Sequence, residues 1–500
     1  MRANHPIIIV ICLRLTIGAI SAAEEGVPLR LAEAIALALD NNLDIAIQQE
    51  LVVVAEAGVI EAAGAFDPSF SAGLTRSEDQ RTLNAESSAA AAGLTRVRTE
   101  SENASVGVSG LTPASTRYNL SAQNRNASDT FNNFEKEHVS SASLTLTQPL
   151  LRGRGTTYTT HGLHLARRNV TISKLDFQLQ VEGILLQVEQ AYWDLLRADR
   201  DRAVRRKSVE AAASLLGQVN IKVEVGTASE ADRVQAQSGL AQRRLSLIAA
   251  ERTHQLQERN VKNLIVKDLA RAPVGFLPLD EPSTNRIVSA QADVLADALA
   301  LRPEMLRSEL DRLTAEEQLR RLKNEALPQV DLEGNYGVNG LGGSFSDAAD
   351  NAAARDDNNW SLGLVYRRAW PDRQRQGALR RQQSVVRRQA LQFQQTRRKI
   401  EAEIEGLFDQ LNGALDEIRA GALAMQFAQL NLDNERAKFE VQKSTVHNML
   451  LLEAELLEAE LSQVRARAEF QKILAELDRA QGRLLERWGI ALEAGGPAIR

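Results

Sequence analysis

Two halves of this sequence follow the same plan, separated by slightly more than 200 residues. The segment VEVGTASEADRVQAQ begins at Val223, and its counterpart FEVQKSTVHNMLLLE begins 216 residues later, at Phe439. The segments around Asp194 and Asp409, and the SLTL and SLGL motifs upstream of them, keep nearly the same offset. A period of this length is too long for a solenoid repeat. The sequence therefore predicts two structurally equivalent halves, each built from strands followed by a long helical hairpin.

Residues 1–23 have the organisation of a secretory signal. A basic start precedes an apolar run, and Ser21-Ala22-Ala23 supplies small residues for cleavage. The run is too short to span a membrane. The only cysteine, Cys12, lies within it, so we expect an exported chain without disulfides or thiolate metal sites.

Composition favours long helices over several compact globular cores. Aromatic residues make up 4% of the chain and there are only 12 prolines, as in proteins rich in long helices and coiled coils. The net charge of −5 gives no general signal for nucleic-acid binding. No later stretch is apolar for long enough to predict a transmembrane helix.

Apolar spacing and proline positions divide the chain into segments. The first repeat is expected over 24–271, with a helix to residue 65, strands within 68–147 and a helical hairpin over 160–267. A linker, 272–288, leads to the second repeat over 289–490, with helices first, strands within 329–366 and a hairpin over 371–488, and then to a C-terminal tail, 491–500. The stretch 78–105 and the Gly/Ser/Asp-rich stretch between the last two strands are expected to be loops.

These lengths constrain how such a chain meets a membrane. Sixty helical residues extend roughly 90 Å, about three times the thickness of a bilayer's hydrocarbon core. Each half offers about two strands, and four strands cannot close a transmembrane barrel, which needs about eight. Because open sheet edges are not tolerated in lipid, copies of the chain would have to pool their strands, and three copies would give about twelve.

The ordered set of segments resembles the TolC family of outer-membrane channel proteins, also called outer-membrane efflux proteins. The matching segments are LAEAIALALDNN, SLTLTQPLLRGRG, QAYWDLL, VEVGTASEADRVQAQ, ALALRPEM, LPQVDLEGNYG, NWSLGLVYR and FEVQKST. They extend over residues 27–490. Each is weak alone, whereas the ordered set, in duplicate behind a secretory signal, is specific.

The resemblance implies a mainly helical fold with a membrane β-barrel portion. Long antiparallel helical hairpins of a homotrimer would form a periplasmic α-barrel, and four strands per chain would contribute to a twelve-stranded barrel in the outer membrane. The implied function is the exit duct of a tripartite efflux or type I secretion system, a passive conduit without enzymatic activity or cofactors. Its implied partners are further copies of itself, a periplasmic adaptor of the membrane-fusion type, an inner-membrane transporter and outer-membrane lipid, but no nucleic acid.

In that family the hairpin turns form the periplasmic tip, where the adaptor docks and the pore narrows. The first turn matches the family pattern Val-Gly-Thr-x-x-x-x-Asp, with candidates Gly226, Thr227, Ser229 and Asp232. Glycine suits a turn that needs a positive φ, and a serine at position 229 can cap the returning helix.

The second turn departs from the family pattern. Its candidate residues are Gln442, Thr445, Asn448, Leu451 and Glu453. Glutamine replaces the usual glycine, and Asn448 and Leu451 occupy positions where some members carry aperture aspartates. Glu453 is the nearest acid, so a cation-selective ring of carboxylates lacks its usual residues here.

An arginine-rich segment follows the last predicted strand. Between Arg367 and Lys399 there are ten arginines, one lysine and a single acid, Asp372. Two interpretations are open. The segment could form an electropositive ring for lipid phosphates or anionic cargo, or it could be a solvated helix face paired with glutamates on neighbouring helices.

The sequence contains no recognisable catalytic motif, such as a P-loop, a GxGxxG after a strand, or a GxSxG. His161 and His164 have helical spacing but no nearby acid or thiol, so we expect no metal site. The rival class is a periplasmic coiled-coil scaffold or a membrane-fusion-type adaptor, which would have one hairpin instead of two in tandem.

Overall fold

The computed structural model describes residues 26–130, 135–271, 273, 275–441, 443–493 and 496–499. The expected signal segment, with Cys12, lies outside these residues. Contacts divide the chain into two compact units, each assembled from three segments. The first unit contains the described residues up to Asn42 together with Leu185–Ile287 and Gln410–Ala475, and the second contains Leu43–Ile184, Val288–Asp409 and the residues from Glu476 onwards.

The first half of the chain runs from β1 to the short 3-10 helix η2. Its elements are β1 (Val27–Leu29), α1 (Leu31–Asn41), α2 (Leu43–Ala63), the 3-10 helix η1 (Gly64–Phe66), β2 (Ser69–Thr82), α3 (Ala85–Ala90), β3 (Arg96–Leu111), β4 (Arg117–Asp129), β5 (Glu137–Pro149), α4 (Thr156–Thr159), α5 (His161–Glu224), α6 (Glu230–Ile265) and η2 (Leu269–Arg271).

The second half runs from β6 to β10. Its elements are β6 (Phe276–Pro278), α7 (Gln291–Leu301), α8 (Pro303–Glu325), β7 (Gln329–Gly342), α9 (Phe345–Ala354), β8 (Asp357–Arg367), α10 (Arg373–Glu440), α11 (Val446–Gln481), α12 (Leu484–Arg487), β9 (Ile490–Glu493) and β10 (Gly496–Ile499).

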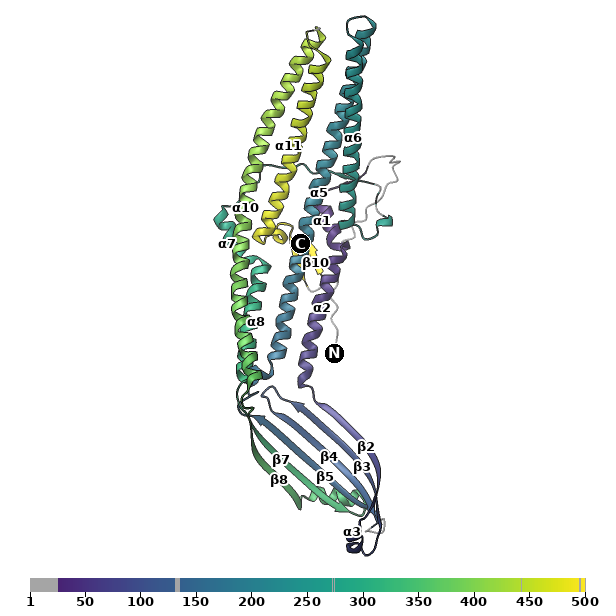
Figure 1. The fold of residues 1–500 in the computed structure, drawn as a ribbon, viewed down its shortest axis with the longest axis vertical. Coiled ribbons are helices and arrows are strands. Elements are labelled where there is room, and N and C mark those ends of the chain that lie inside the picture. Colours follow the sequence, from purple (N-terminus) through teal and green to yellow (C-terminus); the bar gives the residue numbers. More distant parts are fainter. Residues whose placement is uncertain are drawn as a thin grey trace. The chain divides into compact units, whose positions relative to one another are not determined.

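The internal repeat is visible in the helix lengths. Helices α1 and α7 both have 11 residues, and α2 and α8 have 21 and 23. The long helices α5 and α10 have 64 and 68 residues, and α6 and α11 have 36 each. The prediction of a mainly helical, internally repeated fold with long helical hairpins is thus confirmed (Figure 1).

The second unit contains a six-stranded antiparallel sheet in the order β2-β3-β4-β5-β7-β8 (Figure 1). The expectation of four strands per chain is therefore wrong. The first half supplies four strands and the second half two. β2 and β8 are the edges of the sheet, and neither has a further strand beside it in the described part of the chain.

The error arose in the segment ASVGVSGLTPASTRYNLSAQNRN, which contains two strands joined by a tight turn. The N–H groups of Thr112 and Ser115 donate to the carbonyls of Thr116 and Thr112, respectively, and Ser115 has a φ of 74°. β2 and β3 also extend into the polar stretch that was expected to be a loop. Their ladder continues as far as the pair Thr82 and Arg96, although charged and polar residues line it.

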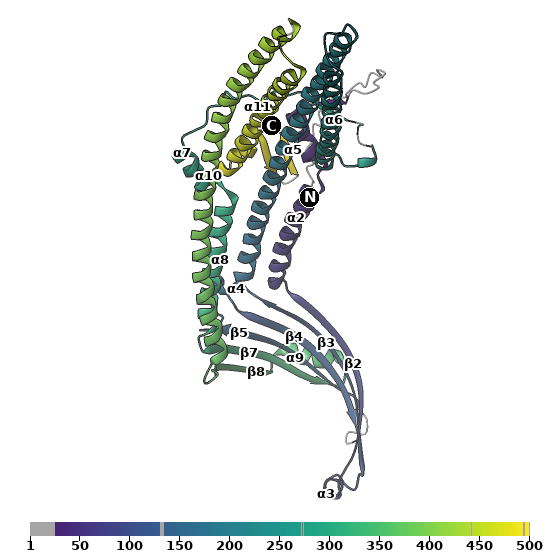
Figure 2. The same cartoon turned by 45° about the horizontal axis from the view of Figure 1, so that its top comes forward.

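A second expected loop, between β7 and β8, contains the helix α9. Ser344 caps this helix by accepting a hydrogen bond from the N–H of Asp347 at 3.2 Å. Gly340 and Gly342 of β7 lie so close to α9 that a Cβ on either would collide with its backbone around Ala348. Figure 2 shows α9 lying beside the strands.

In the first unit, Tyr192 connects α5 to the N-terminal segment. This side chain is fully buried, and its hydroxyl donates to the carbonyl of Leu29 at 3.1 Å and accepts from the N–H of Asp280 at 3.2 Å. The carboxylate of Asp280 in turn accepts from the N–H of Leu31 at 2.8 Å, at the start of α1. These bonds hold β1 in its parallel pairing with β6.

In the second unit, a buried arginine between α7 and α8 joins α8 to α10. Arg302 pairs with Glu304 of α8 at 2.9 Å and with Glu403 of α10 at 2.6 Å. Glu182 of α5 lies nearby with a side chain that is 2% exposed, accepts a hydrogen bond from Gln178 at 2.8 Å and makes no ion pair with any described residue. Burial raises the pKa of Glu182 to about 6.

Among the described residues, no helix is both apolar enough and long enough to span a membrane.

Stability of the second unit should depend on the protonation of Glu182. The pKa of Glu182 is about 4.5 in the unfolded chain and about 6 in the folded one. Between these values folding takes up a proton. The stability gained from the protonated carboxyl is therefore lost as the pH rises through 6. We expect Glu182→Gln to raise the free energy of unfolding by about 2 kcal/mol at pH 7.5 and by little at pH 4.5. Thermal unfolding at both pH values measures this difference.

Glu210→Gln, which changes an exposed glutamate of the same helix, serves as the control. An equal gain in stability of Glu182→Gln at both pH values would contradict the assignment.

Candidate functional site

The first helical turn connects α5 to α6 within the first unit. Gly226 has a φ of +74°, a conformation that favours glycine. The N–H of Thr227 donates to the carbonyl of Lys222 at 2.7 Å, which closes the end of α5. Gly226, Thr227 and Ser229 are exposed.

Ser229 and Asp232 form a capping box at the start of α6. The Ser229 hydroxyl accepts from the N–H of Asp232 at 3.2 Å, and the Asp232 carboxylate accepts from the N–H of Ser229 at 2.9 Å. Hydrogen bonds from Ser229 lower the pKa of Asp232. The aspartate of the family pattern therefore has a local structural role in this turn.

The second turn, between α10 and α11, repeats this geometry at the same offset. The N–H of Lys443 donates to the carbonyl of Lys438 at 2.8 Å, as Thr227 does to Lys222. Thr445 accepts from the N–H of Asn448 at 3.3 Å, so it caps α11 as Ser229 caps α6. Asn448 occupies the position equivalent to Asp232 and is exposed, as is Leu451. Gln442 lies outside the described residues.

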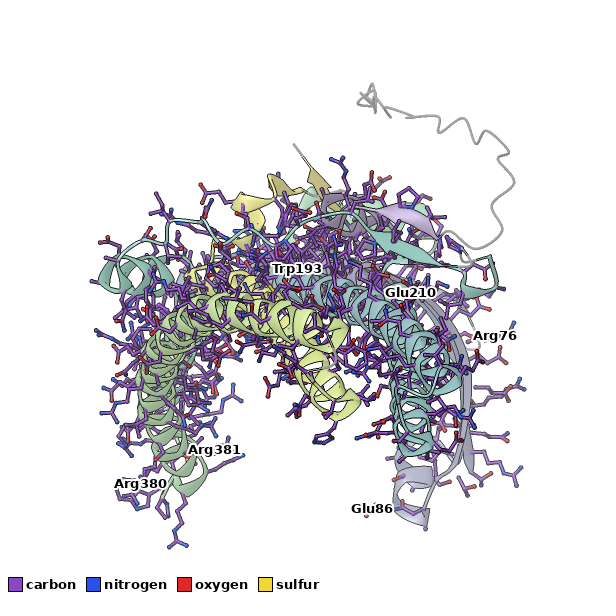
Figure 3. The ribbon with its side chains drawn as sticks, turned by 90° about the horizontal axis from the view of Figure 1, so that it is seen from above. Arg76, Glu86, Trp193, Glu210, Arg380 and Arg381 are labelled. Atoms are coloured by element: carbon purple, nitrogen blue, oxygen red, sulfur yellow. The ribbon has the colours of Figure 1, made fainter. Side chains whose placement is uncertain are left out.

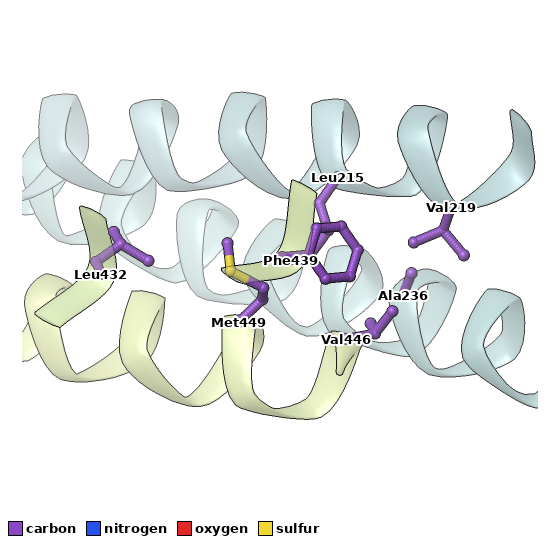
Figure 4. Packing of buried hydrophobic residues seen from close by; sticks show 7 residues of the cluster. All are labelled: Leu215, Val219, Ala236, Leu432, Phe439, Val446 and Met449. Carbon is purple, nitrogen blue, oxygen red and sulfur yellow. The ribbon is translucent and has the colours of Figure 1, made fainter. Parts of the chain in front are cut away.

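A shared apolar cluster joins the two hairpins next to their turns. It consists of Leu215, Val219, Ala236, Leu432, Phe439, Val446 and Met449, all of them buried (Figure 4). The ammonium of Lys222 donates to the carbonyl of Phe439 at 3.0 Å and lies 3.6 Å from the centre of its ring. Gln235 of α6 contacts His447 of α11 at 3.1 Å. The two turns are therefore fixed against each other within one unit.

Glu453 lies within this packing and pairs with Arg243. The two side chains are 8% and 11% exposed, and their charged atoms are 3.0 Å apart. Burial raises the pKa of Glu453, and this effect is larger than the lowering caused by the charge of Arg243. The structure thus brings the nearest acid of the second turn to an arginine of α6.

Several residues of this site were not identified from the sequence. Glu435 accepts hydrogen bonds from Ser444 at 2.5 Å and from Lys438 at 3.0 Å, and so holds the second turn against α10. Lys222 is the counterpart of Lys438 at the same offset of 216 residues. Extending the repeat alignment by one residue upstream of Val223 would have singled out this lysine pair.

The arginine-rich segment forms an exposed face on the N-terminal part of α10. Arg375 pairs with Asp372, Arg397 with Glu401 and Arg367 with Glu333. Other exposed arginines make no ion pair with any described residue: Arg373, Arg380, Arg381, Arg387, Arg388 and Arg398. Figure 3 shows Arg380 and Arg381 projecting from α10. Pairing within the chain therefore accounts for only part of this face.

The two histidines with helical spacing do not form a metal site in the described part of the chain. His161 is buried, and its Nε2 lies 3.0 Å from the amide oxygen of Gln318 on α8. Burial lowers its pKa. Among the described residues, no three histidine, cysteine, aspartate or glutamate side chains are arranged to hold a metal ion.

Comparison with known proteins relates this fold to outer-membrane channels. No protein-family model matches the sequence. The outer membrane protein TolC of Salmonella enteritidis is 23% identical over 368 residues, which cover 71% of each chain.

Two solved structures show the same fold. The outer-membrane channel OprN superposes with a TM-score of 0.69 at 15% identity, over 90% of this chain and 89% of the other. The CmeC outer membrane channel of Campylobacter jejuni superposes with a TM-score of 0.64 at 14% identity, over 91% of this chain and 86% of the other.

Removing Arg243 should loosen the contact between α6 and α11. Arg243→Met leaves Glu453 without its partner, and breaking a buried pair costs about 3–5 kcal/mol. Because the carboxyl can take up a proton instead, the loss should be larger at pH 8 than at pH 5. Hydrogen exchange of α6 and α11 measures the loss as reduced protection.

The matched control is Arg233→Met, which removes the exposed pair with Glu230 on the same helix. We expect its effect to stay below about 0.5 kcal/mol. Equal effects of the two substitutions would show that the Arg243 pair does not stabilise the site.

Proposed function

Since the chain is a member of the TolC family of outer-membrane proteins, we propose that it is the passive outer-membrane duct of a tripartite efflux or type I secretion system. In this proposal a periplasmic adaptor docks on the helical turns, and an inner-membrane transporter supplies the energy. The chain itself contributes a conduit and no chemistry.

The observation that carries the proposal is a sheet with one apolar and one polar face, joined along the chain to helices of 64 and 68 residues. A sheet of this kind suits lipid on one side and water on the other. Two sheet edges that have no partner strand among the described residues explain why such a chain would act only as an assembly of copies. We propose a homotrimer, the assembly that the family resemblance implies.

The paired turns supply a surface suited to an adaptor. Val225 and Val441, equivalent residues of the two halves, are 67% and 62% exposed. Around them lie polar groups of the exposed candidate residues Gly226, Thr227, Ser229 and Thr445. Exposed apolar side chains with a polar surround are typical of protein contacts. Because both turns are fixed by buried contacts, they can present this surface without ordering a loop.

A soluble periplasmic scaffold is the rival function, and cell fractionation separates the two. The proposed channel should fractionate with the outer membrane and migrate faster in detergent gels before heating than after, because a closed strand wall resists the detergent. Recovery of the full chain in the soluble periplasmic fraction would overturn the proposal.

The proposed aperture can be tested through its charge. If Asn448 lines the narrowest part of the pore, Asn448→Asp adds one carboxylate per copy, and a ring of acids favours cations. Reversal potentials in planar bilayers should then shift towards cation selectivity. Ala454→Asp adds the same charge at another exposed position of α11 and should leave selectivity unchanged. Equal shifts for both variants would remove Asn448 from the aperture.

A further inference from the structure

We propose that the membrane wall of the assembled channel contains six strands from each chain, with the hairpin β3–β4 as a full part of it. Three copies would then close a wall of eighteen strands instead of twelve. The strand number per chain comes from the sheet itself, whereas the number of copies rests on the proposed function.

All six strands are long enough to cross a bilayer. They have 14, 16, 13, 13, 14 and 11 residues in sheet order. A tilted transmembrane strand needs about 9–11 residues. The two strands of the additional hairpin, β3 and β4, are therefore as capable of spanning as the outer strands.

One face of the sheet carries a continuous apolar row across all six strands. Pairing in the sheet aligns one residue from each strand: Phe70, Val108, Leu120, Leu144, Tyr336 and Trp360. A neighbouring row on the same face consists of Ala72, Val106, Ala122, Ala142, Val338 and Asn358. β3 and β4 contribute aliphatic side chains to both rows. α9 packs on this same face and lines a cavity over the second row, whereas Leu120 and Leu144 of the first row are exposed, as a lipid-facing surface requires.

The opposite face is polar along the same stretch. The row between the two apolar rows consists of Ser71, Gly107, Ser121, Ser143, Gly337 and Asn359. Ser121 and Ser143 hydrogen-bond across β4 and β5 at 3.0 Å. This alternation is the pattern of a barrel wall between lipid and a water-filled lumen, and it does not change at the additional hairpin.

The pairing also leaves no way to remove the hairpin from the wall without breaking the sheet. β3 pairs with β2 from Ser69 to Thr82, and β4 pairs with β5 from Arg117 to Ala127. If β3–β4 lay outside the wall, both ladders would be lost, and unpaired backbone groups would face lipid.

The occupant of the two open edges is a second copy of the chain. Five antiparallel steps separate β2 from β8, so the two edges run in opposite directions. A neighbour's β2 placed beside β8 therefore continues the antiparallel alternation. Phe70 and Leu74 on β2, and Trp360, Leu362 and Leu364 on β8, lie on the apolar face and are exposed, so the band would continue from one copy to the next.

The two halves differ at the equivalent position. The connection from β7 to β8 contains α9, which packs against Gly340 and Gly342, whereas the connection from β2 to β5 contains the hairpin β3–β4. Because barrel diameter grows roughly in proportion to strand number, eighteen strands would give a wall about 1.5 times as wide as twelve.

Paired cysteine substitutions test whether the hairpin lies in the wall. The only natural cysteine is Cys12, and its Cys12→Ser variant provides the background. Leu120→Cys and Ser121→Cys place a thiol on the apolar and on the polar face of β4. Leu144→Cys and Ser143→Cys are the matched references on β5. The readout is labelling by a charged maleimide and by a lipid-soluble maleimide in intact outer membranes.

The proposal predicts that positions 120 and 144 react at least tenfold faster with the lipid-soluble reagent than with the charged one. Positions 121 and 143 should react at least tenfold faster with the charged reagent. If the charged reagent labels position 120 but not position 144, the hairpin lies outside the wall. This result would overturn the inference and leave the proposed channel function intact. Labelling of both by the charged reagent would overturn the channel as well. Native mass spectrometry counts the copies, and any number other than three would overturn the total of eighteen.

Discussion

The backbone hydrogen bonds of the sheet impose the constraint on which the rest of this molecule depends. Inside a bilayer no water satisfies an open strand edge, and the sheet of this chain has two, at β2 and β8. A single chain cannot close six strands into a barrel, which needs at least about eight. In the proposed channel the edges therefore require further copies, and the number of strands per chain would set the width of the wall that those copies form.

The two halves supply the helical part by duplication, and they have diverged at the turns and in the sheet. Both turns keep the same hydrogen-bond geometry, from Thr227 to Lys222 and from Lys443 to Lys438. The helix caps are retained as Ser229 and Thr445, while the capping aspartate of the first turn is replaced by Asn448 in the second. In the sheet the halves differ more, because one connection became a hairpin and the other a helix. The scaffold tolerates these changes because the buried contacts between α5, α6, α10 and α11 do not involve them.

Local signals predicted the helices, while contacts between distant residues were not accessible from the sequence. Apolar spacing, Gly226 and Ser229 were enough to identify the hairpins and the first turn. The turn at Ser115 was missed because the segment around it was taken as one strand, although it contains two strands whose apolar rows appear once they are aligned. The pairing of Glu453 with Arg243 joins residues 210 positions apart, and no local pattern indicates it. Glu453, which was a candidate because it is the acid nearest the second turn, pairs with Arg243 in the structure.

The most direct measurement is a cryo-electron microscopy reconstruction of the full-length assembly in a lipid nanodisc. The account predicts three copies whose sheets join edge to edge, with β8 of each chain paired to β2 of the next and eighteen strands around a continuous wall. A closed wall of twelve strands, with β3–β4 lying outside it, would contradict the account, as would copies whose sheet edges remain unpaired.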